Sequence, residues 1–252
     1  TTLTGSASNV NSALTSAGIT NLDGDEAVTL SDTTLAAATL NTLDGNTTGA
    51  VDATTVTTLT GSAANMNTAY ASMGISNLAN EAVRLDDASL AAATLNMLDD
   101  NTTGAIDAAT VTTLTGSAAN VNTAYASGGV TNLGDVTVTL TDTTLTVATL
   151  NTLIGYTAGL VDATTVTTLT GSTADVNTAF TAFADGKVAS LGNEAVILTD
   201  KAVFAETVVA IDSATSGAIN ATNVTTLTGS ASNVNSALTS AGVTNLDGDE
   251  AV

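Results

Sequence analysis

Two kinds of short pattern alternate along the chain. Residues 26–30 and 49–59 alternate apolar with polar side chains, which predicts extended strands. In residues 32–43 the apolar side chains fall on one helical face, which predicts a short helix. A weaker helix is predicted over residues 117–127, where Val121 and Tyr125 are four positions apart. The chain is therefore expected to mix strands and short helices throughout.

Small polar residues and glycines recur at the expected element boundaries. Asp32 precedes a predicted helix, where a side chain usually caps the first amides, and aspartates occupy three aligned positions: Asp87, Asp142 and Asp200. A glycine precedes each predicted strand after the helix, which indicates a required turn geometry. These glycines are Gly49, Gly104, Gly159 and Gly217.

The sequence repeats itself at a nearly constant interval of about 55 residues, which is typical of repeat architectures. The hexamer TTLTGS begins at Thr1, Thr57, Thr112, Thr167 and Thr225. Residues 225–252 repeat residues 1–28 with one difference, Val243 in place of Ile19. We expect residues 1–252 to form one continuous segment of a longer array.

Each repeat divides into two similar halves, which predicts a coil of about 27 residues. A unit this short buries a core only by stacking on its neighbours. The predicted fold is a parallel β-solenoid with a short helix or helical turn in each coil, an α/β solenoid. The alternative is a pure β-solenoid, in which the Ala-rich stretches are strands. Ala is a poor strand former, which favours the helical version.

The amino-acid composition argues against several classes of function. The chain has 24 acidic residues against Arg84, Lys187 and Lys201, and it contains no His, Cys or Pro. A net charge of −21 argues against nucleic acid or an anionic membrane as partner. No run of residues is apolar enough to span a membrane. Without His or Cys there is no triad or zinc site, and a catalytic site would not recur in every repeat, so we expect no enzyme.

The acidic residues suggest two roles. Asp52, Asp107 and Asp162 recur before a predicted strand, and Asn220 replaces them in the next copy, which favours local turn hydrogen bonds over an obligatory charge. The segment DGDE instead groups three carboxylates, the oxygen ligands that calcium prefers. This segment, in its two copies, is the candidate calcium site, as the alternative to the favoured interpretation in which the acids only make local hydrogen bonds; no other cofactor is expected. Its residues are Asp23, Asp25 and Glu26, and again Asp247, Asp249 and Glu250.

Recurring Asn and Thr residues suggest ladders between coils. One Asn column follows an apolar residue in every repeat and is expected to hydrogen-bond from coil to coil. It consists of Asn11, Asn67, Asn122, Asn177 and Asn235. Thr-x-Thr pairs, such as Thr55 with Thr57, resemble the ladders of ice-binding proteins, which gives a remote alternative function. Thr is also simply a good strand residue.

The stretch VTLSDTTLAAATLNTLDGNTTGAVDATTVTTLTGSAANMNTAYAS, which starts at Val28, resembles repeats of very long bacterial surface or secreted proteins, cyanobacterial ones included, that are described as β-strand-repeat or adhesin-like. The resemblance covers essentially the whole chain. It implies an extracellular or cell-surface location and a structural role as the shaft of a rod or filament. The alternative is a calcium-responsive adhesin stalk. End-to-end self-association is expected, with anchor and tip domains elsewhere.

Overall fold

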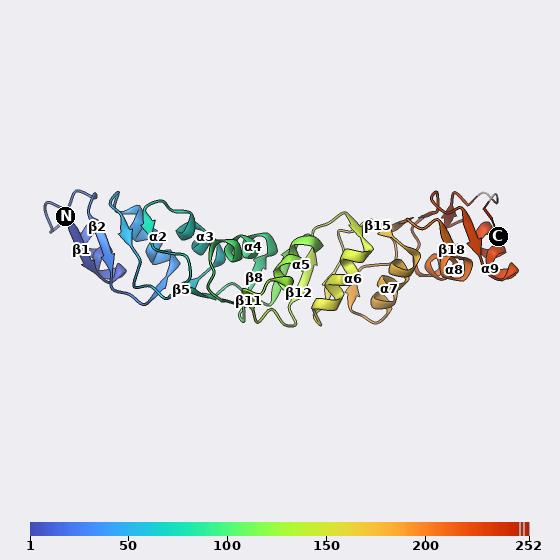
Figure 1. The fold of residues 1–252 in the computed structure, drawn as a ribbon, viewed down its shortest axis with the longest axis horizontal. Coiled ribbons are helices and arrows are strands. Elements are labelled where there is room, and N and C mark those ends of the chain that lie inside the picture. Colours follow the sequence, from blue (N-terminus) through green and yellow to red (C-terminus); the bar gives the residue numbers. More distant parts are fainter. Residues whose placement is uncertain (247, 249, 252) are drawn as a thin grey trace. The chain divides into compact units, whose positions relative to one another are not determined.

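In the computed structural model, which describes residues 1–246, 248, 250 and 251, short helices alternate with short parallel strands (Figure 1). The predicted mixture of parallel sheets and helices is confirmed, and the alternative without helices is wrong. The helices are α1 (Ala7–Leu14), α2 (Ala37–Gly45), α3 (Ala63–Ala71), α4 (Ala92–Asn101), α5 (Ala118–Ala126), α6 (Val147–Tyr156), α7 (Thr173–Ala184), α8 (Ala205–Ala214) and α9 (Ala231–Thr239).

The strands are of five kinds, which follow one another in each repeat. The strand of the TTLTGS segment is β1 (Thr2–Gly5), β5 (Thr58–Gly61), β10 (Thr113–Gly116), β15 (Thr168–Gly171) or β20 (Thr226–Thr228). After the helix comes β6 (Ile75–Ser76), β11 (Val130–Thr131), β16 (Val188–Ala189) or β21 (Val243–Thr244). The third kind is β2 (Ala27–Leu30), β7 (Ala82–Leu85), β12 (Thr137–Leu140) or β17 (Ala195–Leu198).

The two remaining kinds flank the second helix of each repeat. Directly before it lies β3 (Thr34–Ala36), β8 (Ser89–Ala91), β13 (Thr144–Thr146) or β18 (Ala202–Phe204). After it lies β4 (Val51–Asp52), β9 (Ile106–Asp107), β14 (Val161–Asp162) or β19 (Ile219–Asn220).

The chain divides into two compact units. Unit 1 comprises Thr1–Thr112 and Thr123–Leu133, and unit 2 comprises Thr113–Asn122 and Gly134–Val252. Unit 1 holds two parallel sheets, with strand orders β1-β2-β4-β6 and β3-β5-β7-β9-β11. Unit 2 holds β10-β12-β14-β16, then β13-β15-β17-β19-β21, and the pair β18-β20.

Each of these strands lies parallel to a strand of another kind that precedes or follows it in the chain. In unit 1, Thr34 lies opposite Thr58, and Thr58 lies opposite Ala82. In unit 2, Thr144 lies opposite Thr168, whereas the three extra residues of the fourth repeat lengthen the step from Val161 to Val188. Paired strands are therefore usually separated by fewer residues than the predicted coil contains. Their usual separation is close to the 24 residues between Thr33 and Thr57.

The difference arises because a repeat is not two equal coils. The two strand-to-strand steps of a repeat together are shorter than the repeat, and the difference is the stretch from Ala27 in β2 to Thr34 in β3. The strand β2 belongs to one sheet and β3 begins the next. Dividing the repeat length by two cannot reveal this, because the extra stretch between β2 and β3 occurs in only one half of each repeat.

The core is a set of columns of aliphatic side chains. In the second sheet of unit 1, Leu35, Leu59, Val83 and Ile106 lie in register, and all four are buried. The flanking threonines of these strands point the other way, because side chains alternate along a strand. The buried leucines of α2 add to this core, since α2 contacts β3 and β5. Apolar burial of this kind is the main stabilising term.

Candidate functional site

The aspartates expected to cap their own helices cap a different helix. Helix α2 begins at Ala37, not at Asp32, because residues 34–36 are extended and pair with β5. The Asp32 carboxylate accepts a hydrogen bond of 2.7 Å from the amide of Ala7, the first residue of α1. Aligned bonds join Asp87 to Ala63, Asp142 to Ala118 and Asp200 to Thr173. Each carboxylate thus ties one coil to the preceding helix, where the positive end of the helix dipole favours an anion.

A buried glutamate, which the sequence reading missed, closes the loop before β2 and its counterparts. Its carboxylate accepts amide hydrogen bonds from that loop. Glu26 takes them from Asp23 at 2.8 Å and Gly24 at 3.1 Å. The aligned glutamates are Glu26, Glu81, Glu194 and Glu250, and each is at most 8 % exposed. The signal was the recurrence of Glu-Ala-Val in four of the five copies.

A buried threonine and a glycine complete the same junction. The Thr47 hydroxyl donates to the carbonyl of Glu26 at 2.6 Å and accepts from the amide of Gly49 at 3.0 Å. Gly49 lies so close to the Glu26 carbonyl that a Cβ would overlap it. The glycine is therefore required by a close approach of two backbones, and its φ is not among the positive values of the chain. We name this set of Glu, Thr and Gly, wherever a repeat has all three, the loop clamp.

The repeats differ in which groups donate hydrogen bonds to the buried glutamate carboxylate. The Tyr70 hydroxyl donates to Glu81 at 3.1 Å, and burial together with the charge of Glu81 raises the pKa of Tyr70 to about 12. In the fourth repeat Phe180 occupies the aligned position at the same place in its helix. Oε1 of Glu194 is buried there and has no hydrogen-bond partner among the described residues. The amides of Gly192 and Asn193 both donate to the other oxygen, Oε2, and Phe180 has no hydroxyl to offer to Oε1.

Replacing Phe180 with Tyr should raise the free energy of unfolding by about 1 kcal/mol, because it restores a partner to a buried acceptor. Tyr70→Phe should lower it by about the same amount. Urea unfolding of both variants measures the two changes. Destabilisation of F180Y by more than about 1 kcal/mol, the size of one hydrogen bond, would show that the hydroxyl does not reach Glu194.

A second network surrounds Asp52 at the end of β4. Its carboxylate accepts hydrogen bonds from the hydroxyl and amide of Thr54 and, at 2.8 Å, from the side-chain amide of Asn77. These bonds hold the pKa of Asp52 below its usual value. Asn77 has φ +66, a conformation that Asn tolerates, so its side chain reaches back across the coil.

The aligned aspartates make related bonds. Asp107 accepts from Asn132 at 2.7 Å and from the amide of Ala109, and these bonds, with Arg84 nearby, lower its pKa. Asp162 accepts from Thr164, whose hydroxyl also donates to Ser190. Asn220 replaces the aspartate and accepts the same bonds from Thr222 and Asn245. These side chains serve as turn acceptors that join neighbouring coils.

The lowered pKa values predict a specific acid response. A carboxylate whose folded pKa lies below its unfolded value of about 4 stabilises the fold above that pH and loses this contribution as the pH falls further. Replacing both Asp52 and Asp107 with Asn should therefore flatten the decline in unfolding free energy between about pH 5 and 2. Urea unfolding across this range measures it, with Asp86→Asn as an exposed control. An unchanged slope in the double variant would contradict the assignment.

The Asn residues link successive helices. Asn67 donates to the carbonyl of Thr94 and Asn122 to that of Thr149, both at 3.0 Å. Asn11 and Asn67 also accept from Asn46 and Asn101. The backbone carbonyl of Asn235 accepts from Thr239, and Asn177 lines a surface hollow on α7. Where these side chains donate to a carbonyl, they bind the backbone of the next helix rather than stacking on one another.

The Thr-x-Thr pairs also join coils. The Thr55 hydroxyl donates to the carbonyls of Leu30 and Asp32, and the Thr57 hydroxyl to that of Thr33. In the fourth repeat the Asn223 amide donates to Leu198 in the place of the first threonine. The hydroxyls of these pairs are thus directed to backbone carbonyls of the preceding coil.

The DGDE segment does not gather its acids. Glu26 is 2 % exposed and faces the loop amides, whereas Asp23 and Asp25 are exposed. Burial would raise the pKa of Glu26, but the amide bonds and the N-terminal amine hold it below its usual value. In the described part of the chain no three acidic side chains are placed to hold a metal ion. Asp247 and Asp249 lie outside the described residues, and Glu250 accepts from Gly248. Calcium binding stays a prediction.

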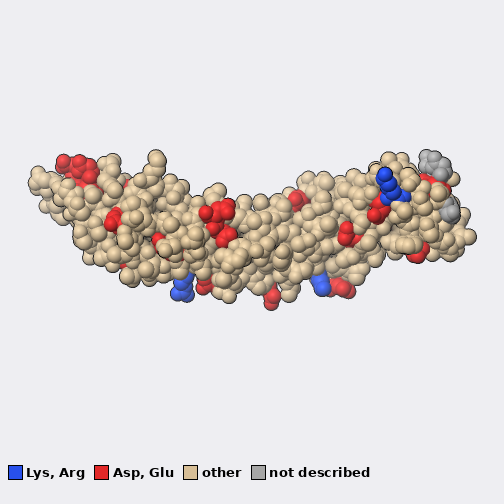
Figure 2. All heavy atoms as spheres, viewed as in Figure 1, with Lys and Arg blue, Asp and Glu red and all other residues tan. Residues whose placement is uncertain are grey.

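The surface carries acids in several separate places on the face shown in Figure 2. Among the described residues, no helix has the length and apolar character needed to traverse a bilayer. In comparisons with known proteins, no family model, curated sequence or solved structure matches the chain.

Proposed function

We propose that this chain is a structural repeat protein, an α/β solenoid that forms part of the shaft of an extracellular or cell-surface filament. One observation carries the proposal: in both units the side-chain hydrogen bonds recur from one coil to the next. Asp32 to Ala7 spans 25 residues, and Asp142 to Ala118 spans 24. The repeated residues therefore serve cohesion between coils.

This arrangement suits a load-bearing element. Parallel strands join neighbouring coils by backbone hydrogen bonds, and the loop clamps, Asp caps and Thr pairs add side-chain bonds in most repeats. Stability in such proteins is a sum of coil and interface terms, so length is added without a new core design. Acidic residues on the outside favour solubility. The partners we propose are further repeats of the same kind, stacked end to end.

The proposal predicts an elongated particle in solution. Stacked helices lie about 8–10 Å apart, so the proposed shaft, as a single row of the nine helices of the described residues, would be a rod of roughly 80 Å with a radius of gyration of about 25 Å. A compact globule of this length has a radius of gyration of about 18 Å. Small-angle X-ray scattering at about 0.15 M salt, where charge repulsion is screened, distinguishes the two. A value near that of the globule would exclude a shaft built by stacking.

A further inference from the structure

The repeat that begins at Thr112 differs from the others at several aligned positions. At each of these positions its side chain is more apolar or larger. Where the first two repeats have Glu, Asp, Asn and Ala, it has Val136, Ile154, Tyr156 and Leu160. In addition, the inserted residues of the next coil place Lys187 just beyond the end of α7, after Asp185 and Gly186.

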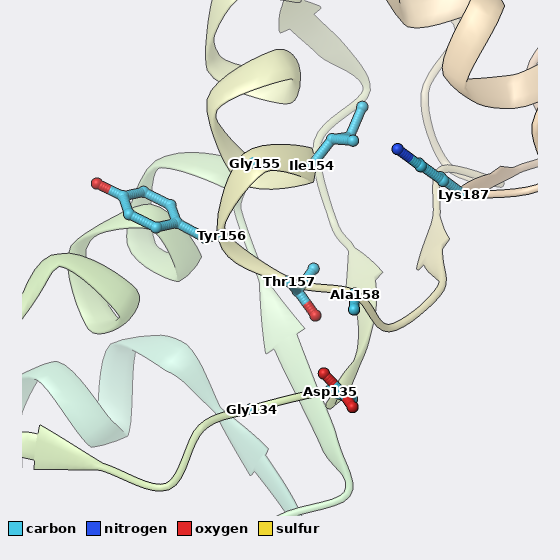
Figure 3. Close-up of a pocket in the computed structure, with 8 residues that line it drawn as sticks. All are labelled: Gly134, Asp135, Ile154, Gly155, Tyr156, Thr157, Ala158 and Lys187. Atoms are coloured by element: carbon cyan, nitrogen blue, oxygen red, sulfur yellow. The ribbon is translucent and has the colours of Figure 1, made fainter.

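The structure brings several of these changes together around one surface hollow of about 440 Å³ in unit 2. Figure 3 shows the side chains of Ile154 and Lys187 pointing toward one another at one end, with Asp135 at the other end. Ala158 lies between them, and the ring of Tyr156 points away. The hollow has a mixed polar and apolar lining, with one cation and one anion at opposite ends.

The change at Ile154 is matched by a change in its neighbour. In other repeats the aligned aspartate accepts a serine hydroxyl 28 residues further on, at 2.7 Å for Asp44 and Ser72. Asp99 with Ser127 and Asp212 with Ser240 make the same bond. At the same separation from Ile154 lies Ala182, which is buried in the lengthened α7. The Asp–Ser pair of the other repeats is thus replaced at both positions by an apolar pair, Ile154 and Ala182.

The local charge also changes. Val136 and Ile154 remove two carboxylates that other repeats have, and Lys187 adds an ammonium group. Among the described residues no ion pair to the Lys187 ammonium is found. An exposed cation without an ion-pair partner, next to the apolar side chains of Ile154 and Ala158, attracts an anion that also has an apolar part, although the protein has a net charge of −21.

We propose that this hollow binds a small amphiphilic carboxylate. Its apolar body lies on Ile154 and Ala158, and its carboxylate binds the Lys187 ammonium. The hollow is within the size range of small-molecule sites, about 300–1,000 Å³. Asp135 at the far end disfavours a second negative group, so monocarboxylates are preferred over dicarboxylates.

Benzoate is a suitable probe, and amide NMR shifts of the full chain at about 0.15 M ionic strength report its binding. We expect saturable shifts confined to the residues of the hollow, with a dissociation constant on the order of 1 mM for a ligand of this size. Benzamide, which has the same shape without the charge, should bind at least about tenfold more weakly, as should terephthalate.

Two lysine variants distinguish specific binding at the hollow from non-specific attraction of benzoate to any lysine. Lys187→Ala should weaken benzoate binding at least about tenfold, whereas Lys201→Ala should leave it unchanged. Circular dichroism checks that both variants fold, which is expected because only the backbone of Lys187 bonds to Ala182 and Val161. The proposal is overturned if benzoate gives no saturable shift up to about 20 mM, if benzamide binds equally well, or if K201A weakens binding as much as K187A.

Discussion

Replacing Gly104 with Ala should lower the free energy of unfolding by about 3 kcal/mol or more. A Cβ at this position would overlap the backbone carbonyl of Glu81 and lie 2.8 Å from that of Asn80. Neither backbone can yield easily. The amide of Gly104 is bonded to the buried Thr102 hydroxyl, and β7 is paired on both sides. Overpacking in a rigid interior costs about 1–3 kcal/mol, and separating the backbones also breaks the loop clamp.

Gly45→Ala is the matched control. Gly45 is the last residue of α2, and a Cβ there meets no atom within 4 Å. Since Ala favours helix over Gly, this variant should be unchanged or up to about 1 kcal/mol more stable. Urea unfolding of both variants gives the comparison. If G104A loses no more stability than G45A, the close approach at the loop clamp is not a constraint on folding.

The element types could be predicted from the sequence because local chemistry decides them. The alternation around Val28 and Leu30 places side chains on two faces of a strand, and the structure has β2 there. The predicted helix over residues 117–127 is α5. The repeat also let each prediction be checked in several copies, which a chain without repeats does not offer.

Register and long-range partners could not be predicted. Residues 32–36 read as the start of a helix, but pairing of Thr34–Ala36 with β5 keeps them extended, so tertiary hydrogen bonds override local preference. Asp32 then lies free of its own helix and reaches Ala7 instead. No local pattern contains the long sequence separation across which this bond forms.

The candidate site was predictable where the bonds are local. Recurrence of Asp52, with Asn220 as a replacement, indicated a turn acceptor, and the Asx-type bonds to Thr54 and Thr222 are local. The buried glutamates were missed because acidic residues are usually exposed. Glu26 was read as a calcium ligand for the same reason, since its burial depends on how the loop folds over it.

Deleting one whole repeat, residues 57–111, should leave a folded protein. The deletion joins Val56 to Thr112, which reproduces a natural junction, and the strands and helices that it removes have equivalents in the next repeat. Deleting residues 57–83 removes half a repeat instead and joins Val56 to Arg84. That variant lacks β5 and α3, so β3 loses its strand partner and α2 loses a neighbour. We expect it to lose most of its stability.

The thermal unfolding of these two deletion variants beside the intact chain, followed by circular dichroism, tests the central claim that the whole repeat, with its two unequal halves, is the indivisible unit of the stack. The account predicts a cooperative transition within about 5 °C of the intact chain for the whole-repeat deletion, and a lost or strongly lowered transition for the half-repeat deletion. Equal stability of the two deletions would mean that the half-repeats are interchangeable, and would contradict it.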